Sequence, residues 1–139
     1  MSKIRVQASG LTDPGRVRSN NQDNFHIDLE RGLFLVSDGM GGHQAGEIAS
    51  QAVCQALPQA LQATLRQLCD APQRVVELTL REMVLRFSQQ LRDETAHKAG
   101  LKGMGATLDL LWLRQDRAHI VHMGDSRVYL WRGGQLRQL

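Results

Sequence analysis

Aromatic residues are scarce in this sequence, at 4% of 139 residues. The formal net charge is only +3, and the arginines that produce it are scattered along the chain. Proteins that bind nucleic acids usually combine a basic patch with aromatic side chains on which the bases stack. We therefore expect no nucleic-acid partner.

Cysteines are few and long apolar runs are absent. Cys54 and Cys69 lie in stretches with helical spacing and form no CxxC or CxxH motif, which favours a reduced compartment over a disulfide framework. The opening residues, MSKIRVQASG, contain no apolar segment of signal-peptide length, and no later run could span a membrane. We expect a cytoplasmic protein with no membrane partner.

Alternating apolar and polar residues predict β-strands at both ends of the chain. Three are expected first, at residues 3–9, 24–28 and 33–38, with the last two joined as a hairpin. Further strands are expected in residues 106–114, 117–125 and 127–139, where QDR and RGGQ are hairpin signals.

Two long helices are expected between these groups of strands. Apolar residues recur at helical spacing from Ile48 to Leu65, and Pro58 should kink this helix or begin a second segment. Pro72 should open a longer helix that continues to Gly100. Strands, a helix pair and further strands predict an α+β fold with a mainly antiparallel sheet.

The stretch VSDGMGGHQAGE, residues 36–47, has more glycine than a turn requires. A dinucleotide-binding GxGxxG motif beginning at Gly39 fails because Gln44 replaces the third glycine. A P-loop fails because Glu47 stands where the lysine belongs, and a carboxylate repels phosphate. Bare nucleotide binding is therefore excluded.

A divalent cation would explain the acids in this stretch, because hard cations bind carboxylate and carbonyl oxygens. Asp38 ends one predicted strand, Asp23 stands at the entry to another and Asp125 ends a third, so the three should converge at one edge of a sheet. Asp109 should instead lie at the surface or at the rim of the core. The alternative for Asp38 is an exposed acid in a structural turn.

Four segments together resemble one protein family. GRVRSNNQD, FLVSDGMGGHQAGEIAS, GMGATLDLLWL and HMGDSRVYLWRGGQL are similar, in order and spacing, to the bacterial metal-dependent serine/threonine phosphatases of the protein phosphatase 2C family. The resemblance implies an antiparallel β-sandwich flanked by helix pairs (αββα), incomplete in this chain. It also implies hydrolysis of phosphoserine and phosphothreonine by a metal-activated water, with two or three Mn(II) or Mg(II) ions per complete domain.

The resemblance assigns metal ligands residue by residue. Asp38 should bridge two metals, and Gly39 should offer its carbonyl oxygen to one of them. Asp23 should contact the centre largely through metal-bound water, and Asp125 should help to hold a weaker third metal.

The resemblance also assigns catalytic groups. Arg18, rather than Arg16, should bind the substrate phosphate, because a guanidinium group matches its oxygens. His43 is available as a general acid for the leaving alkoxide, with helix capping or ordering of water as the equally open alternative. Met40 occupies the position where animal members place a histidine.

The family's later metal-binding aspartates do not occur between Asp125 and Leu139. We therefore expect residues 1–139 to be the N-terminal part of one catalytic domain, as a fragment or a truncated gene product, with little or no activity alone. The competing hypothesis is a phosphatase-like piece that binds metal or a partner without turnover. The partners implied for the complete protein are phosphorylated proteins, including a cognate serine/threonine kinase or its targets.

Overall fold

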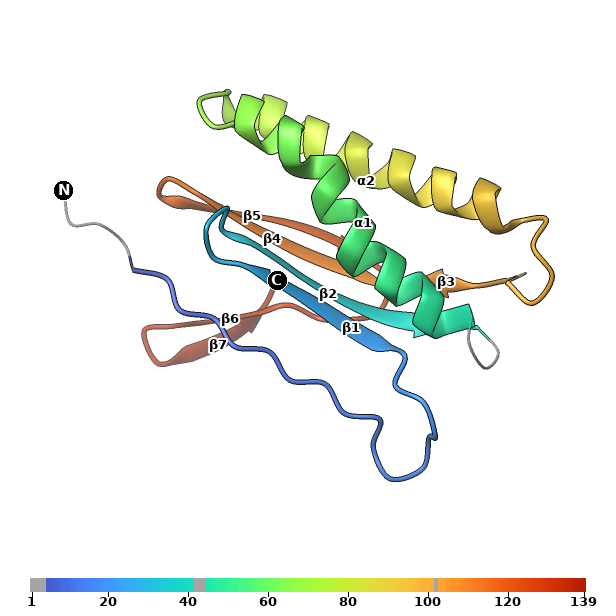
Figure 1. The fold of residues 1–139 in the computed structure, drawn as a ribbon. Coiled ribbons are helices and arrows are strands. Elements are labelled where there is room, and N and C mark those ends of the chain that lie inside the picture. Colours follow the sequence, from blue (N-terminus) through green and yellow to red (C-terminus); the bar gives the residue numbers. More distant parts are fainter. Residues whose placement is uncertain (1–4, 42–44, 102) are drawn as a thin grey trace.

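The computed structural model describes residues 5–41, 45–101 and 103–139. An antiparallel sheet in the order β1-β2-β4-β5 forms the central layer, and the short strand β3 pairs with the end of β2. Helices α1 and α2 cover one face of this sheet (Figure 1). The strands are β1 (Asp23–Asp28), β2 (Leu33–Met40), β3 (Gly105–Ala106), β4 (Leu108–Arg114), β5 (Arg117–Met123), β6 (Tyr129–Arg132) and β7 (Gln135–Gln138), and the helices are α1 (Ala45–Gln67) and α2 (Gln73–Thr95).

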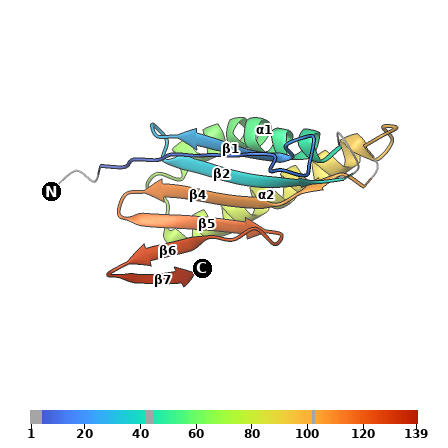
Figure 2. The ribbon, with the colours of Figure 1, turned by 90° about the horizontal axis from the view of Figure 1, so that it is seen from below.

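The predicted α+β class with antiparallel pairing is confirmed. The expected hairpins are present as β1–β2, β4–β5 and β6–β7. Strands β6 and β7 form a separate sheet, which follows β5 when the molecule is seen from below (Figure 2). The helices lie on one side of the central sheet only, which agrees with a partial sandwich (Figure 1).

Strand β2 shows how the sequence builds the core. Leu33 and Leu35 are 0% and 1% exposed, whereas Val36 on the opposite face is 52% exposed. This alternation directs one set of side chains towards the helices and the other set, which includes Asp38, away from them. The apolar core toward the helices also contains Val53, Leu57, Leu61 and Leu65 of α1, Val76, Leu80 and Val84 of α2, and Leu108, Leu110 and Trp112 of β4.

The helix boundaries settle one alternative and differ from one expectation. Helix α1 runs through Pro58, so no second segment begins there, and the kink stays a prediction; Leu57 and Leu61 on either side are fully buried, and tertiary packing outweighs the cost of proline. Helix α2 ends at Thr95, before Gly100, where the Thr95 hydroxyl bonds to the carbonyl of Leu91. In the described part of the chain, no helix is long and apolar enough to cross a membrane.

The strand expected over residues 3–9 is the clearest error. Residues 5–9 are exposed and belong to no ladder among the described residues, and residues 3 and 4 lie outside them. Alternation identifies a segment able to form a strand, but a ladder also requires a neighbouring edge. The chain instead passes along the face of the sheet opposite the helices, where Gly10 packs on the ring of Phe25 (Figure 1).

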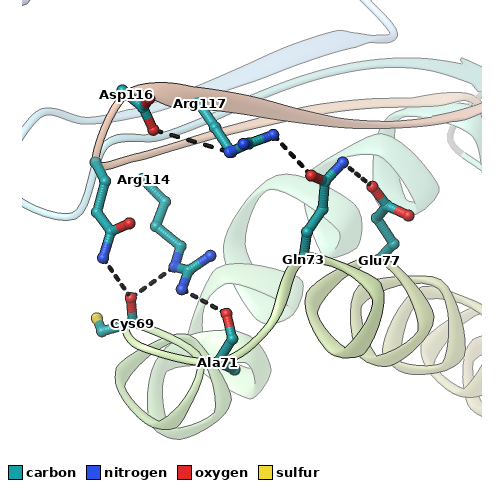
Figure 3. Close-up of polar contacts among 8 residues, drawn as sticks. Cys69, Ala71, Gln73, Glu77, Arg114, Asp116 and Arg117 are labelled. Atoms are coloured by element: carbon teal, nitrogen blue, oxygen red, sulfur yellow. Dashed lines mark hydrogen bonds and ion pairs between the residues drawn. The ribbon is translucent and has the colours of Figure 1, made fainter.

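The turn between α1 and α2 is fixed to the sheet mainly by one arginine, and Gln115 adds a longer hydrogen bond to the carbonyl oxygen of Cys69 at 3.2 Å (Figure 3). Arg114, at the end of β4, is 9% exposed. Its Nε donates to the carbonyl oxygen of Cys69 at 2.6 Å and its Nη2 to that of Ala71 at 2.6 Å. Nearby, Arg117 donates to Gln73 at 2.7 Å, but this contact lies at the surface.

We expect Arg114→Met to lower the free energy of unfolding by about 2 kcal/mol, because methionine keeps the apolar stem but leaves both carbonyls without their charged donor. Arg117→Met is the matched control and should change it by no more than about 0.5 kcal/mol. Urea unfolding of the two variants measures the difference. Equal effects would show that the buried arginine does not secure the helix turn.

Candidate metal centre

Two acidic residues face each other across the β1–β2 hairpin. The strand register pairs Asp23 with Asp38 directly, so both side chains project from the sheet face opposite the helices. Like charges in this position destabilise a sheet. The facing pair of carboxylates therefore lowers the stability of the hairpin, and the need for a stable fold does not explain it.

The electrostatics of Asp38 show which charged groups surround it. Partial burial raises the pKa of Asp38, although much of the residue is exposed. The charge of Asp23, a hydrogen bond with Asp23 and the charge of Asp125 raise this pKa further, while the charge of Arg18 lowers it. The structure thus brings together Asp23 of β1, Asp38 of β2, and two loop residues, Arg18 and Asp125. The three carboxylates come together at one end of the sheet, as their positions at strand ends predict.

The glycines of the stretch have a packing role that sequence reasoning missed. A Cβ atom on Gly39 would lie 1.9 Å from the carbonyl oxygen of Gly46 and 2.8 Å from that of Gln22. A Cβ atom on Gly46 would lie 2.7 Å from the carbonyl oxygen of Gly39. The end of β2 and the first turn of α1 are therefore in direct backbone contact, and only glycine fits at both positions.

Thr107, which precedes β4, is a residue of the candidate site that the sequence did not reveal. It is 1% exposed. Its backbone N–H donates to the carbonyl of Asp38 at 2.8 Å, and its Oγ1 accepts from the N–H of Asp38 at 2.9 Å. Its carbonyl oxygen accepts from the hydroxyl of Ser37 at 2.7 Å. These bonds hold the main chain at Asp38 from both sides.

Thr107 also holds the turn that carries Asp125. Its hydroxyl lies 2.6 Å from the Ser126 hydroxyl in a shared hydrogen bond, and a Cβ on Gly124 would lie 2.7 Å from Cγ2 of Thr107. One buried side chain therefore sets the relative position of Asp38 and the Gly124–Ser126 turn. The only signal in the sequence is a polar residue near the start of the strand sequence GATLDLL, which also contains Asp109, and this signal is too weak to identify such a role.

A cleft of about 390 Å³ adjoins the carboxylates. Its walls come from residues 10–13, from β1 and β2, and from Ser126, and Asp23 and Asp38 line it. Arg18 belongs to the exposed loop between this N-terminal segment and β1. The cleft thus opens beside two acids, with a guanidinium group near one of them.

These donors fit a hard divalent cation in part. Partial burial raises the pKa of Asp38, and the carboxylates around it raise this pKa further. A cation there would offset the repulsion between these carboxylates. Among the described residues, however, no group of three His, Cys, Asp or Glu side chains is arranged to hold an ion. Water or ligands from elsewhere would have to complete the coordination shell.

The remaining predicted site residues are placed as follows. The carbonyl oxygen of Gly39 lies close to Gly46, and its role as a metal ligand stays a prediction. His43 lies outside the described residues, so the geometry does not bear on it. Asp109, expected at the surface or at the rim of the core, is instead 8% exposed.

Comparison with known proteins identifies a family. The family profile "Protein phosphatase 2C" matches residues 15–139. The chain is 34% identical over 137 residues to the serine/threonine phosphatase stp of Listeria monocytogenes, covering 96% of this chain and 53% of that protein. It is 36% identical over 134 residues to the serine/threonine protein phosphatase PstP of Mycobacterium tuberculosis, covering 96% of this chain and 24% of that protein.

Solved structures agree. The catalytic domain of PstP in complex with two manganese ions has a TM-score of 0.69 and 35% identity, covering 93% of this chain and 52% of that chain. PppA of Pseudomonas aeruginosa, described as a key regulatory component of T6SS, has a TM-score of 0.74 and 35% identity, covering 92% and 53%. The chain spans about half the length of the stp phosphatases that it matches.

We expect Asp38→Asn to stabilise the metal-free protein at neutral pH. The raised pKa of Asp38 means that the folded state binds its proton more tightly than the unfolded state. Stability therefore falls as pH rises from about 3.8 through the folded pKa, and the loss persists above it. Because Asp38 is exposed, solvent screening should limit the gain in the variant to no more than about 1 kcal/mol.

Asp28→Asn, on the same hairpin, is the control with the opposite sign. Burial acts to raise the pKa of Asp28, but hydrogen bonds and charge from Arg31 lower it overall. This variant should be slightly less stable at neutral pH. Urea unfolding in excess chelator measures both, and a destabilised Asp38→Asn protein would show that the carboxylates do not repel one another.

Proposed function

The chain belongs to the protein phosphatase 2C family, and on that basis we propose that the complete protein is a metal-dependent phosphatase acting on phosphoserine and phosphothreonine in proteins. The observation that carries the proposal is the convergence of Asp23, Asp38 and Asp125 with Arg18 beside them. Carboxylates suit a divalent cation, and a guanidinium group suits the phosphate oxygens of a substrate. Mn(II) or Mg(II), two or three per complete domain, is the proposed cofactor.

Each residue has a proposed role. Asp38 would hold two ions, with help from the carbonyl of Gly39, and Asp23 would bind largely through water. Asp125 would hold a further, weaker ion. When bound, such ions lower the pKa of water and neutralise charge on phosphate oxygens.

The chain's own groups would orient the substrate. Arg18 can form a forked pair of charge-assisted hydrogen bonds with phosphate and so fix the phosphorus near the carboxylate cluster. His43 remains the proposed general acid, with capping or ordering of water as the open alternative. Substrates would be phosphorylated proteins, including a cognate kinase or its targets, in the cytoplasm.

Residues 1–139 are proposed to be the N-terminal part of one catalytic domain. A second candidate function is binding of metal or a partner without turnover. It is favoured by one observation: the described residues hold no group of three metal-binding side chains. Ions that lack protein ligands neither bind tightly nor position a reacting water well.

We expect the complete protein to hydrolyse a phosphothreonine peptide with Mn(II) and to lose this activity in excess EDTA. Asp38→Asn should reduce kcat at least about 100-fold, because removing a ligand and its charge disturbs both ions. Asp28→Asn, remote from the cluster, should remain active. Residues 1–139 alone should bind Mn(II) weakly and turn over little or no substrate.

Activity that persists in EDTA would contradict the proposed chemistry. Full activity of Asp38→Asn would show that the centre is assigned to the wrong residues. Tight Mn(II) binding and full turnover by residues 1–139 would contradict the view that they form only part of the catalytic unit.

We expect Arg18→Ala to lower kcat/KM by about tenfold to a hundredfold, mainly through KM, because a charge-assisted contact contributes roughly 1.5–3 kcal/mol. Arg16→Ala is the matched control from the same loop and should have little effect. Steady-state kinetics on a phosphothreonine peptide measures both variants. The reverse ranking would assign phosphate binding to Arg16.

A further inference from the structure

His122, near the end of β5, connects a buried acid to the turn that carries Asp125. Its Nδ1 lies 2.6 Å from Oδ1 of Asp109, the residue directly opposite on β4. Its Nε2 lies 2.9 Å from the carbonyl oxygen of Gly124. Both partners are hydrogen-bond acceptors, and only a doubly protonated imidazolium donates from both ring nitrogens.

Asp109, which binds the ring of His122, is itself largely buried. The Asp109 side chain is 9% exposed, whereas that of His122 is 45% exposed. A buried carboxylate without a partner is costly, so the ion pair holds the ring in one orientation. The pKa of His122 is raised, first by its hydrogen bond with Asp109, and the bond to the Gly124 carbonyl adds to the effect.

The turn itself is confined on its other side. Gly124 has φ of 112°, a conformation that strongly favours glycine, and it packs against Thr107 too closely for a Cβ. Ser126 shares a hydrogen bond with Thr107. His122 supplies a further restraint, on the carbonyl immediately before Asp125.

We propose that His122 is a positioning residue for the metal centre, anchored by Asp109, and that it holds the Gly124–Asp125 turn so that the Asp125 carboxylate faces Asp38. This inference rests on the proposed function, since it takes Asp125 to be a metal ligand. Groups that orient metal ligands commonly affect affinity almost as strongly as the ligands themselves. The simpler alternative is that His122 only neutralises Asp109.

Two amide substitutions distinguish these roles, because each can replace one ring nitrogen. The amide of His122→Gln can occupy the place of Nε2 and donate to the Gly124 carbonyl. The amide of His122→Asn can occupy the place of Nδ1 and donate to Asp109 only. If the contact between His122 and the Gly124 carbonyl positions Asp125, the glutamine variant should keep its affinity for Mn(II) and the asparagine variant should lose it.

The experiment is a Mn(II) titration of the full-length protein by calorimetry, without substrate. His122→Ala should weaken binding at the weakest site about tenfold, His122→Asn should behave like it, and His122→Gln should stay within about threefold of wild type. His119→Gln is the control on the same strand. His119 is 7% exposed and its ring packs 5.6 Å from Trp112, so this variant should lose stability but retain the affinity of the folded protein.

A second pair of variants guards against failure to fold, since removing His122 alone leaves the Asp109 carboxylate unpaired. Asp109→Ala/His122→Gln and Asp109→Ala/His122→Ala both lack the buried charge and differ only in the contact with Gly124. The glutamine version should bind Mn(II) more tightly, by about tenfold at the weakest site.

Equal affinities within this pair, or an asparagine variant that binds as well as the glutamine variant, would overturn the inference. Wild-type affinity in His122→Ala would also overturn it. These outcomes differ from failure of the proposed function, in which wild-type protein would bind no Mn(II), or Asp38→Asn would bind it as tightly as wild type.

Discussion

Two carboxylates face each other across β1 and β2, and the apolar layer beneath them holds them in place. Opposed like charges on paired strands lower stability, and after partial burial the charge of Asp23 is the next largest cause of the raised pKa of Asp38. The opposite face of the same strand buries Leu33 and Leu35 against the helices. Burial of these side chains stabilises the hairpin by several kcal/mol, which offsets the repulsion at its end.

Hydrogen bonds made by Thr107 define the rest of the site. Thr107 binds the backbone of Asp38 and the hydroxyl of Ser126. The carboxylate oxygens of Asp38 are thereby left to interact with neighbouring charges. Such a site fixes the backbone of Asp38 but leaves its carboxylate free to change orientation. This would suit a cation whose shell of oxygen ligands is flexible.

Local pattern predicted most of the elements and the positions of the acids at the strand ends. The β1–β2 hairpin, both helices and the acids at strand ends follow from periodicity and turn residues, which act over a few positions. Thr107 and the Asp109–His122 pair could not be found in this way, because their partners lie on other strands. The strand expected over residues 3–9 failed for the same reason: pairing is a property of two segments, and alternation describes only one.

The pairing of β2 with β4 has a consequence for the order of folding. In the sequence, both helices come between these two strands. The hydrogen bonds that join Ser37 and Asp38 to Thr107 therefore span 70 and 69 residues. Closing so long a loop costs conformational entropy before the pairing contacts can form, so non-local pairings of this kind form slowly. Local structure that forms earlier within the loop lowers this cost. The helix pair and the β1–β2 hairpin are expected to form first, and the carboxylate cluster is completed among the last parts of the chain.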